Sequence, residues 1–525
     1  MSDEIQDASS ASAGAPATAE AGDLVGAVRR GTRWVFYAQI ASQLVSLGVL
    51  AVMYRLVKPE EYGLFAAALP AVMLPRMAAT LGLSTAVLQE PELSHEQKSG
   101  LFWLSVVLGL AAAAVTAVCG PLLAAAYNQP PLAEICLALA GATIIAVLGN
   151  QHLALLEREL KLREASAARL VALVSGGLAG VLTARRGAGV WALVAQQYAE
   201  LAVLTVWVWM LEPWRPGWPG PAARLRQFVA FSTSYSLSQL VNYAALNLDK
   251  IVIPLALGAA GERVLGLYSQ AQNLMMRPVS VLTSPLTGVM VAGLAKARDD
   301  QALRTELAAK FFRLAGVGLL PCAVGLAVVA PDVMLVLGGQ RWSEAGMLLA
   351  VLAPAIVAHG LNNLAAYVLS SAGRAGYLLL AMLLLLLLLV QGMLAGLFFG
   401  RTFLAGSTAD AALAPALGMA IAQTAAVTLV WLGPYLWFCL RTAQLDDATV
   451  LRVLLPPLRA ALLMGAVVWL LRLMLIQTPS ISPAVRLLAL IGAGVLSYAL
   501  LAQRDVRWAI GELTVERGAT PAATP

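Results

Sequence analysis

The sequence predicts an all-α membrane protein that crosses the bilayer many times. Hydrophobic residues make up 60% of the 525-residue chain and charged residues only 12%. Apolar runs of about twenty residues recur along it, and a helix needs about this length to span roughly 30 Å of hydrocarbon. A soluble domain carries about twice this share of charge, and a membrane β-barrel shows shorter, alternating segments. We therefore expect a polytopic helical bundle.

About 14 transmembrane helices are expected, because that many apolar segments are long enough to span. Their connections are short, and no external loop is long enough to form a domain. The segments lie at about 33–57, 62–88, 100–121, 132–157, 166–184, 188–211, 228–257, 265–295, 311–330, 345–371, 376–400, 410–440, 451–475 and 481–502.

The positive charges predict the orientation of the chain. If the N-terminus is cytoplasmic, most of the 35 Lys and Arg residues fall in connections on that same side. Lys and Arg are enriched in cytoplasmic loops, and an even number of spans returns the C-terminus to the starting side. Both termini are therefore predicted to be cytoplasmic, with Arg185 and Arg186 as a local exception.

The chain contains two halves that look related. Aligning Gly63 with Gly266 brings Pro75 and Pro278 to the same offset, and each proline has an arginine beside it. Repeated halves with interrupted helices are common in secondary transporters. The sequence thus predicts two pseudo-repeated six-helix bundles plus two C-terminal helices. The predicted parts are a disordered cytoplasmic tail (1–30), a first six-helix bundle (31–211), a cytoplasmic linker (212–227), a second six-helix bundle (228–440), two extra transmembrane helices (441–510) and a cytoplasmic tail (511–525).

Two arginines lie deep inside predicted spans. Arg76 and Arg277 are roughly 20 Å from the outer ends of their helices at 1.5 Å per residue. A charge at that depth is costly and normally faces a packed interior or a water-filled cavity. Guanidinium binds phosphate bidentately and stays charged at physiological pH. The pair predicts a cationic cavity between the halves, although each arginine could instead brace helices through backbone carbonyls.

The seventh predicted span is unusually polar. Asp249 and Lys250 are neighbours, and Asn242 and Asn247 fall on adjoining stripes of the same helix. This face is predicted to line the cavity, with an internal ion pair or a helix–helix contact as the open alternative. Asp249 and His359 are the two candidates for coupling proton movement to transport, although a packing role is favoured for the histidine.

The sequence does not predict an enzyme. It has no GxxxxGK[ST] phosphate-binding loop and no paired-carboxylate or nucleophile constellation. The four cysteines have neither CxxC spacing nor nearby histidines, so we expect no metal site and no cofactor. Because no basic run with interleaved aromatic residues occurs, no nucleic-acid partner is expected.

Three segments carry a resemblance to a known family. These are RLVKPEEYG at 55–63 within the stretch 31–89, HLALLERELKLRE at 152–164, and the stretch 247–286 that contains LGLYSQ. In this order and spacing they resemble Wzx-type polysaccharide flippases, particularly the colanic-acid-like subgroup. That family belongs to the multidrug/oligosaccharidyl-lipid/polysaccharide exporter superfamily. The match covers roughly positions 30–300, and the remainder resembles the family mainly in hydropathy.

The resemblance implies an architecture and a substrate. Two six-helix bundles would surround a central cavity and work by alternating access. The substrate would be an undecaprenyl-diphosphate-linked oligosaccharide, turned across the bacterial inner membrane for surface polysaccharide biosynthesis. Arg76 and Arg277 occupy spans in which related flippases place cationic residues on the diphosphate. A polysaccharide polymerase and glycosyltransferases would be partners.

Three other functions stay open at this point. A multidrug or cation exporter of the same superfamily needs carboxylates in its cavity, whereas the membrane-depth charges here favour an anionic ligand. A lipid II flippase would differ in that its loss stops cell-wall growth. A membrane scaffold for glycan assembly would tolerate replacement of both arginines.

Overall fold

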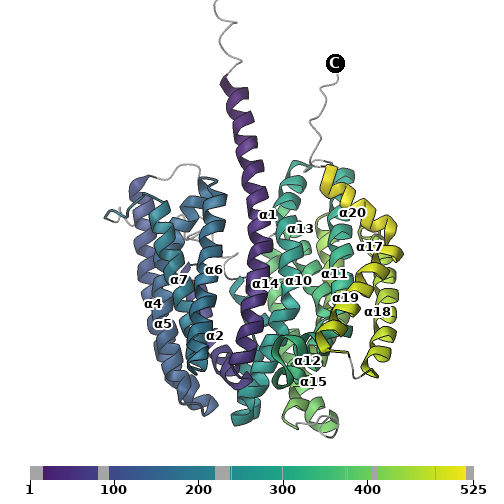
Figure 1. The fold of residues 1–525 in the computed structure, drawn as a ribbon. Coiled ribbons are helices and arrows are strands. Elements are labelled where there is room, and N and C mark those ends of the chain that lie inside the picture. Colours follow the sequence, from purple (N-terminus) through teal and green to yellow (C-terminus); the bar gives the residue numbers. More distant parts are fainter. Residues whose placement is uncertain are drawn as a thin grey trace, which may run out of the picture. The chain divides into compact units, whose positions relative to one another are not determined.

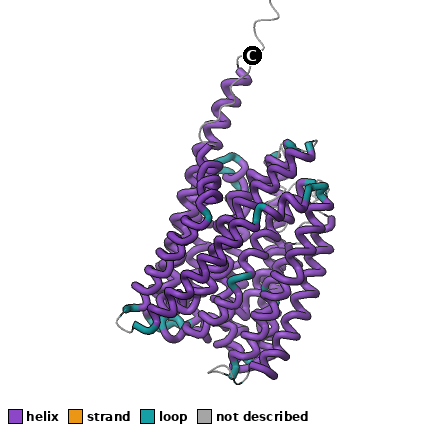
Figure 2. Tube along the Cα trace, turned by 90° about the vertical axis from the view of Figure 1, so that its right-hand side faces the viewer, coloured by secondary structure: helices purple, strands orange, loops and turns teal. Residues whose placement is uncertain are grey.

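The protein is helical wherever its structure is described. The computed structural model describes residues 16–80, 94–218, 237, 239–297, 300–372, 374, 376–404, 406, 411–478 and 481–515. Figure 2 shows helices joined by short loops, and no strand occurs in these ranges. Helices satisfy their own backbone hydrogen bonds, which lipid requires. The predicted fold class, a polytopic all-α membrane protein, is confirmed.

Fewer described helices are long and apolar enough to span a membrane than the 14 predicted. Eleven of the described helices are long and apolar enough to cross a membrane. A twelfth span results if the bent pair Gln340–Leu352 and Ala355–Ser371, which meets at 51°, is counted as one. The long helices Val190–Leu211 and Gly261–Lys296 fall outside this set, and both carry several amide or charged side chains. A count of 14 is therefore not confirmed.

The chain forms two compact units. The first comprises Met1–Leu50, Ala79–Val115 and Ala138–Ser232, and the second comprises Ala51–Ala78, Thr116–Leu137 and Thr233–Pro525. Four helices contribute residues to both units: α1 (Pro16–Leu56), α2 (Pro59–Thr80), α4 (His95–Tyr127) and α5 (Pro131–Arg158). The domain boundaries drawn from the sequence stay a prediction.

In the first unit, helices α6 (Leu162–Arg185) and α7 (Val190–Leu211) pack closely through small residues. Gly176 and Gly180 on α6 lie against α7. A Cβ added at Gly176 would lie 2.8 Å from the Cβ of Glu200 and 2.9 Å from the carbonyl oxygen of Gln196. Small residues allow two membrane helices to approach closely, so this glycine face holds the pair together.

The N-terminal tail is shorter than predicted. Residues 1–15 lie outside the described residues, but residues 16–30, predicted to be disordered, are the first turns of α1. Proline suits the first turn of a helix. The alanine-rich stretch after it is continuous with the first predicted span, so it adds turns to an existing helix and needs no nucleation of its own.

The second unit is built around α10 (Gly261–Lys296), α11 (Gln301–Gly338), α12 (Ser343–Leu352) and α13 (Ala355–Ser371). Its largest fully buried side chains include Tyr268, Phe312 and Trp342. The remaining helices pack around these four. They are α2 (Pro59–Thr80), α9 (Asp249–Leu257), α14 (Gly376–Phe399), α15 (Leu413–Ala425), α16 (Leu432–Thr442), α17 (Asp447–Arg452), α18 (Leu455–Ile476), α19 (Pro483–Leu501) and α20 (Gln503–Val515).

The last membrane helices, α18 and α19, lie beside α11 (Figure 1). A buried carboxylate joins them, because Asp332 on α11 accepts hydrogen bonds from Arg472 Nε at 2.6 Å and from Arg486 Nε at 2.7 Å. Asp332 is 1% exposed. One side chain of α11 therefore fixes both extra helices.

A further helix, α20, follows α19 and was not predicted. It covers residues 511–515 of the stretch predicted as a tail, and residues 516–525 lie outside the described part. Arg313 on α11 forms an ion pair with Asp505 at 2.6 Å and stacks over the Trp508 ring at 4.2 Å. The helix is too polar to span a membrane, which is why a search for apolar runs misses it.

Candidate functional site

A polar cavity of about 500 Å³ lies against α10 in the second unit. Arg277 lines it, and Asn363 and Tyr367 of α13 contribute to the same lining. The other polar side chains that line it come from α10 and recur every three or four residues, so they share one helix face. They are Asn273, Ser280, Thr283, Ser284 and Thr287.

A smaller cavity of about 170 Å³ adjoins the first. The two share Met276, Asn363 and Tyr367 in their linings. Asn242, from the helical segment before α9, and His359 of α13 line the smaller one. Of the predicted site residues, Arg277, Asn242 and His359 thus line two adjoining cavities.

Two buried polar side chains line the smaller cavity. His359 is 8% exposed and Asn362 is 9% exposed. The Oδ1 atom of Asn362 is buried and accepts no hydrogen bond from the described residues. A buried acceptor without a donor costs about 1–3 kcal/mol. A ligand that donates a hydrogen bond here would remove that cost.

The Asp249–Lys250 pair is not part of either cavity lining. Asp249 is 0% exposed and Lys250 is 5% exposed. Lys250 Nζ donates to Asn247 Oδ1 at 2.5 Å, and Asn247 Nδ2 donates to the Tyr243 carbonyl oxygen at 2.8 Å. Lys250, Asn247 and Tyr243 therefore form a local network within one segment. Whether Asp249 takes part in coupling stays a prediction.

Arg76 is half-buried on α2, and one of its terminal nitrogens lies 2.9 Å from the Met73 sulfur. It lies near Tyr243, which adjoins the cavity-lining Asn242 in sequence. Arg277 lies near Tyr54 on α1. Arg76 is absent from the linings of both cavities. A cavity shared by the two arginines stays a prediction.

The turn between α1 and α2 packs tightly on the second half of the chain. Tyr54 stacks on Trp342 with ring centroids 4.4 Å apart, and the Trp342 Nε1 donates to the Tyr54 carbonyl oxygen at 2.8 Å. The Tyr54 hydroxyl donates to Gln270 Oε1 at 3.0 Å. Arg263 forms ion pairs with Glu60 at 3.7 Å and Glu344 at 2.8 Å. We call these contacts the hairpin clasp.

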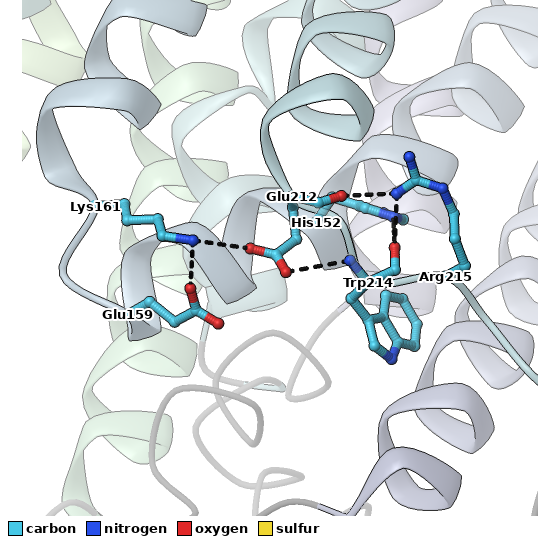
Figure 3. A network of polar contacts seen from close by, with 6 residues as sticks. All are labelled: His152, Glu159, Lys161, Glu212, Trp214 and Arg215. Carbon is cyan, nitrogen blue, oxygen red and sulfur yellow. Dashed lines mark hydrogen bonds and ion pairs between the residues drawn. The ribbon is translucent and has the colours of Figure 1, made fainter.

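The first unit holds a second polar network that was not predicted (Figure 3). His152 of α5 contacts the Trp214 carbonyl oxygen through Nε2 at 3.2 Å and stacks on Trp209 at 4.2 Å. Lys161 lies 2.6 Å from Glu159 and 3.6 Å from the buried Glu212. The hydrogen bond with Glu159 raises the pKa of Lys161. The network holds the start of the linker against α5.

The serine and threonine side chains of α10 that line the larger cavity were not predicted as site residues, although their spacing in the sequence indicates a shared helix face. Serine and threonine cost little in a membrane helix because their hydroxyls donate to backbone carbonyls one turn back, as Thr283 donates to Val279 at 2.8 Å and Thr287 to Thr283 at 3.0 Å. Such residues attract less attention than charges. Their spacing of three or four residues on the helix of Arg277 would have identified them.

Comparisons with known proteins agree with the fold and with the sequence resemblance. A family model described as "Polysaccharide biosynthesis protein" matches residues 52–346. The chain is similar to the lipopolysaccharide biosynthesis protein WzxC of Escherichia coli (strain K12), with 25% identity over 60% of this chain and 64% of WzxC. It is also similar to the succinoglycan biosynthesis transport protein ExoT of Rhizobium meliloti (strain 1021), with 24% identity over 62% of this chain and 65% of ExoT. The matched region thus spans just under two thirds of each of these relatives.

A solved structure shares the architecture. The inward closed conformation of the lipid II flippase MurJ matches 91% of this chain and 99% of its own chain, with a TM-score of 0.70 and 12% identity. At this identity the likeness concerns the fold alone. The chain therefore has the helical arrangement of a known membrane protein over nearly its whole length.

Proposed function

The chain belongs to the polysaccharide biosynthesis protein family, and from this premise we propose that it translocates undecaprenyl-diphosphate-linked oligosaccharide across the bacterial inner membrane by alternating access. WzxC and ExoT, by their names, serve lipopolysaccharide biosynthesis and succinoglycan transport. Surface polysaccharide biosynthesis is the pathway class that these relatives share. Both termini would be cytoplasmic, as the charge distribution predicts.

Arg277 is the observation that carries the proposal. It lines a polar cavity of about 500 Å³, and no Asp or Glu is among the described residues that line this cavity. Guanidinium binds phosphate groups bidentately and stays charged at physiological pH, so a polar cavity lined by Arg277 favours an anionic ligand such as a diphosphate. A cation exporter requires the opposite charge, so the cavity does not favour that function.

The substrate-binding residues of the proposal fall into two groups. Arg277 would bind the diphosphate, with Arg76 as a second cation from the first half. Asn242 would contribute polar lining. Asn247, bonded to Lys250, would support that wall together with Asp249 and Lys250, and Asp249 would be the candidate for coupling an ion. A polymerase and glycosyltransferases would supply and use the lipid-linked glycan.

Reconstitution tests this function directly. The protein would be placed in proteoliposomes with a fluorescent lipid-linked glycan, and movement between leaflets would be measured. We expect Arg277→Ala to reduce transport about 10- to 100-fold, because a charge-assisted hydrogen bond contributes about 1.5–3 kcal/mol. Arg76→Ala should also reduce it, whereas Arg341→Ala, at an exposed position outside both cavities, should not.

Two results would overturn the proposal. Transport by the wild-type protein could be absent under every ion gradient tested. Alternatively, both arginine variants could transport at the wild-type rate at equal expression, which would favour a scaffold. A lipid II flippase would be recognised by transport of lipid II and by arrested cell-wall growth on depletion.

A further inference from the structure

The smaller cavity has a lining that is polar and free of formal charge. Amide, imidazole and hydroxyl side chains surround it on several sides, with Leu378, Met382 and Leu385 of α14 on another. No Asp, Glu, Lys or Arg occurs among the described residues that line it. The polar members are Gln239, Asn242, His359, Asn362, Asn363, Tyr367 and Ser370.

Side-chain packing alone does not account for the polar lining of the smaller cavity. Polar side chains at membrane depth are costly, and those in a packed interior normally bond to one another. Asn362 departs from this rule, because its Oδ1 is buried and accepts no hydrogen bond from the described residues. An acceptor held in a polar cavity points to a ligand that donates hydrogen bonds.

Amide side chains present both donors and acceptors, as sugar hydroxyl groups do. A ligand with several hydroxyls can therefore bond to Asn242 on one side and to Asn362 on another. An acidic sugar would find no cation in this lining and would lose its hydration without compensation. The cavity thus suits an uncharged sugar better than a uronic acid.

The smaller cavity lies next to the cavity in which the proposed function places the diphosphate of the substrate. It adjoins the cavity of Arg277 and shares Met276, Asn363 and Tyr367 with it. Resting on the proposed function, we propose that the smaller cavity binds the first, uncharged sugar of the lipid-linked glycan while Arg277 binds the diphosphate. Asn242 and Asn362 are then specificity-determining residues for that sugar.

Binding measurements on the full-length protein in nanodiscs test this assignment. Three probes would be used: undecaprenyl diphosphate alone, the same lipid bearing one neutral hexosamine, and the same lipid bearing one hexuronic acid. We expect wild-type protein to prefer the neutral sugar to the uronic acid. Asn242→Leu and Asn362→Leu each should weaken binding of the neutral-sugar lipid about tenfold, which corresponds to about 1.4 kcal/mol.

The controls separate the subsite from folding and from the diphosphate site. Leucine keeps the branched shape of asparagine and removes its hydrogen-bonding groups. Binding of undecaprenyl diphosphate alone should stay within about twofold of wild type in both variants, which shows that they are folded. Gln239→Leu offers a half-buried alternative if a buried variant does not fold. Gln391→Leu, at an exposed position on α14, is the matched amide control and should change nothing.

The possible outcomes distinguish the two proposals. Selective loss of the neutral-sugar lipid supports the subsite. Equal loss for all three probes, unchanged binding of the neutral-sugar lipid, or a wild-type preference for the uronic acid would overturn the subsite and leave the flippase function standing. If wild-type protein binds none of the undecaprenyl lipids, the proposed function fails and the subsite fails with it.

Discussion

Two glycines that align between the halves of the sequence lie against each other. A Cβ added at Gly63 would lie 1.8 Å from the carbonyl oxygen of Glu262, and one added at Gly266 would lie 1.8 Å from that of Pro59. The contacts are reciprocal, because the start of α2 approaches α10 just as the start of α10 approaches α2. This reciprocity supports the repeat inferred from the sequence.

Because backbone atoms occupy the space, a methyl group at either glycine cannot be accommodated by a side-chain rotation. We expect Gly63→Ala and Gly266→Ala each to lower the free energy of unfolding by about 1–3 kcal/mol, the usual cost of overpacking. Equilibrium unfolding in mixed micelles would measure it. Gly48→Ala is the matched control, since nothing lies within 4 Å of its added Cβ. Equal stability of all three variants would contradict the close approach.

The sequence predicted individual cavity-lining residues better than it predicted which of them lie together. Arg277, Asn242 and His359 could be found because a charged or polar side chain is conspicuous among apolar neighbours. That Arg277 and His359 line adjoining cavities depends on how α10 packs against α13, and no local pattern encodes this contact. Asn362 lies one turn after His359 and was not predicted as a site residue, because only the packed structure shows that its Oδ1 accepts no hydrogen bond from the described residues.

At the scale of helices, hydropathy predicted most elements because lipid imposes one simple requirement on a span. The ends were less predictable. The helix α1 extends to Pro16, and α20 forms through contacts of Asp505 and Trp508 with α11. Both depend on helix propagation or on tertiary contacts, which an apolar-run criterion does not detect.

Tertiary contacts also explain several arginines in connections that the charge distribution predicts to be non-cytoplasmic. Arg472 and Arg486 bind the buried Asp332, Arg263 pairs with Glu60 and Glu344, and Arg401 donates to the Ala256 carbonyl oxygen at 2.5 Å. These arginines have structural partners. They therefore weigh less as topology signals than arginines in open loops.

Asp332 connects three helices, so its replacement should loosen the last two spans. We expect Asp332→Asn to lower the free energy of unfolding by about 3–5 kcal/mol, because it leaves two largely buried arginines without their carboxylate. Unfolding in mixed micelles would measure the loss, and protease accessibility of the connection between α18 and α19 would locate it. Asp447→Asn is the control, since its ion pair with the exposed Arg441, at 3.4 Å, should contribute no more than about 1 kcal/mol. Equal effects of the two changes would contradict this role of Asp332.

At the scale of the whole molecule, alternating access requires that one end of the transporter opens while the other closes. The hairpin clasp holds the α1–α2 turn against α10 and α12 through Tyr54, Trp342 and Arg263. Tyr62 adds edge-to-face contacts with both aromatic rings, with centroids 5.5 and 5.3 Å away. If the protein works as proposed, these contacts must separate in each transport cycle.

A covalent link across the clasp should therefore stop transport without harming the fold. In a background lacking the four native cysteines, Glu60→Cys and Arg263→Cys would be joined by a short bifunctional methanethiosulfonate. We expect transport of the lipid-linked glycan to fall at least tenfold on linking and to recover when a reductant cleaves the new disulfides, because a linked clasp cannot open.

Each single-cysteine variant should be unaffected by the reagent. The matched control is the pair Arg441→Cys and Asp447→Cys, which lies where α16 is followed by α17. The transport cycle does not require these two residues to separate, so linking them should leave transport unchanged. Full transport with the clasp linked would show that this end stays closed throughout the cycle, and alternating access through it would have to be abandoned.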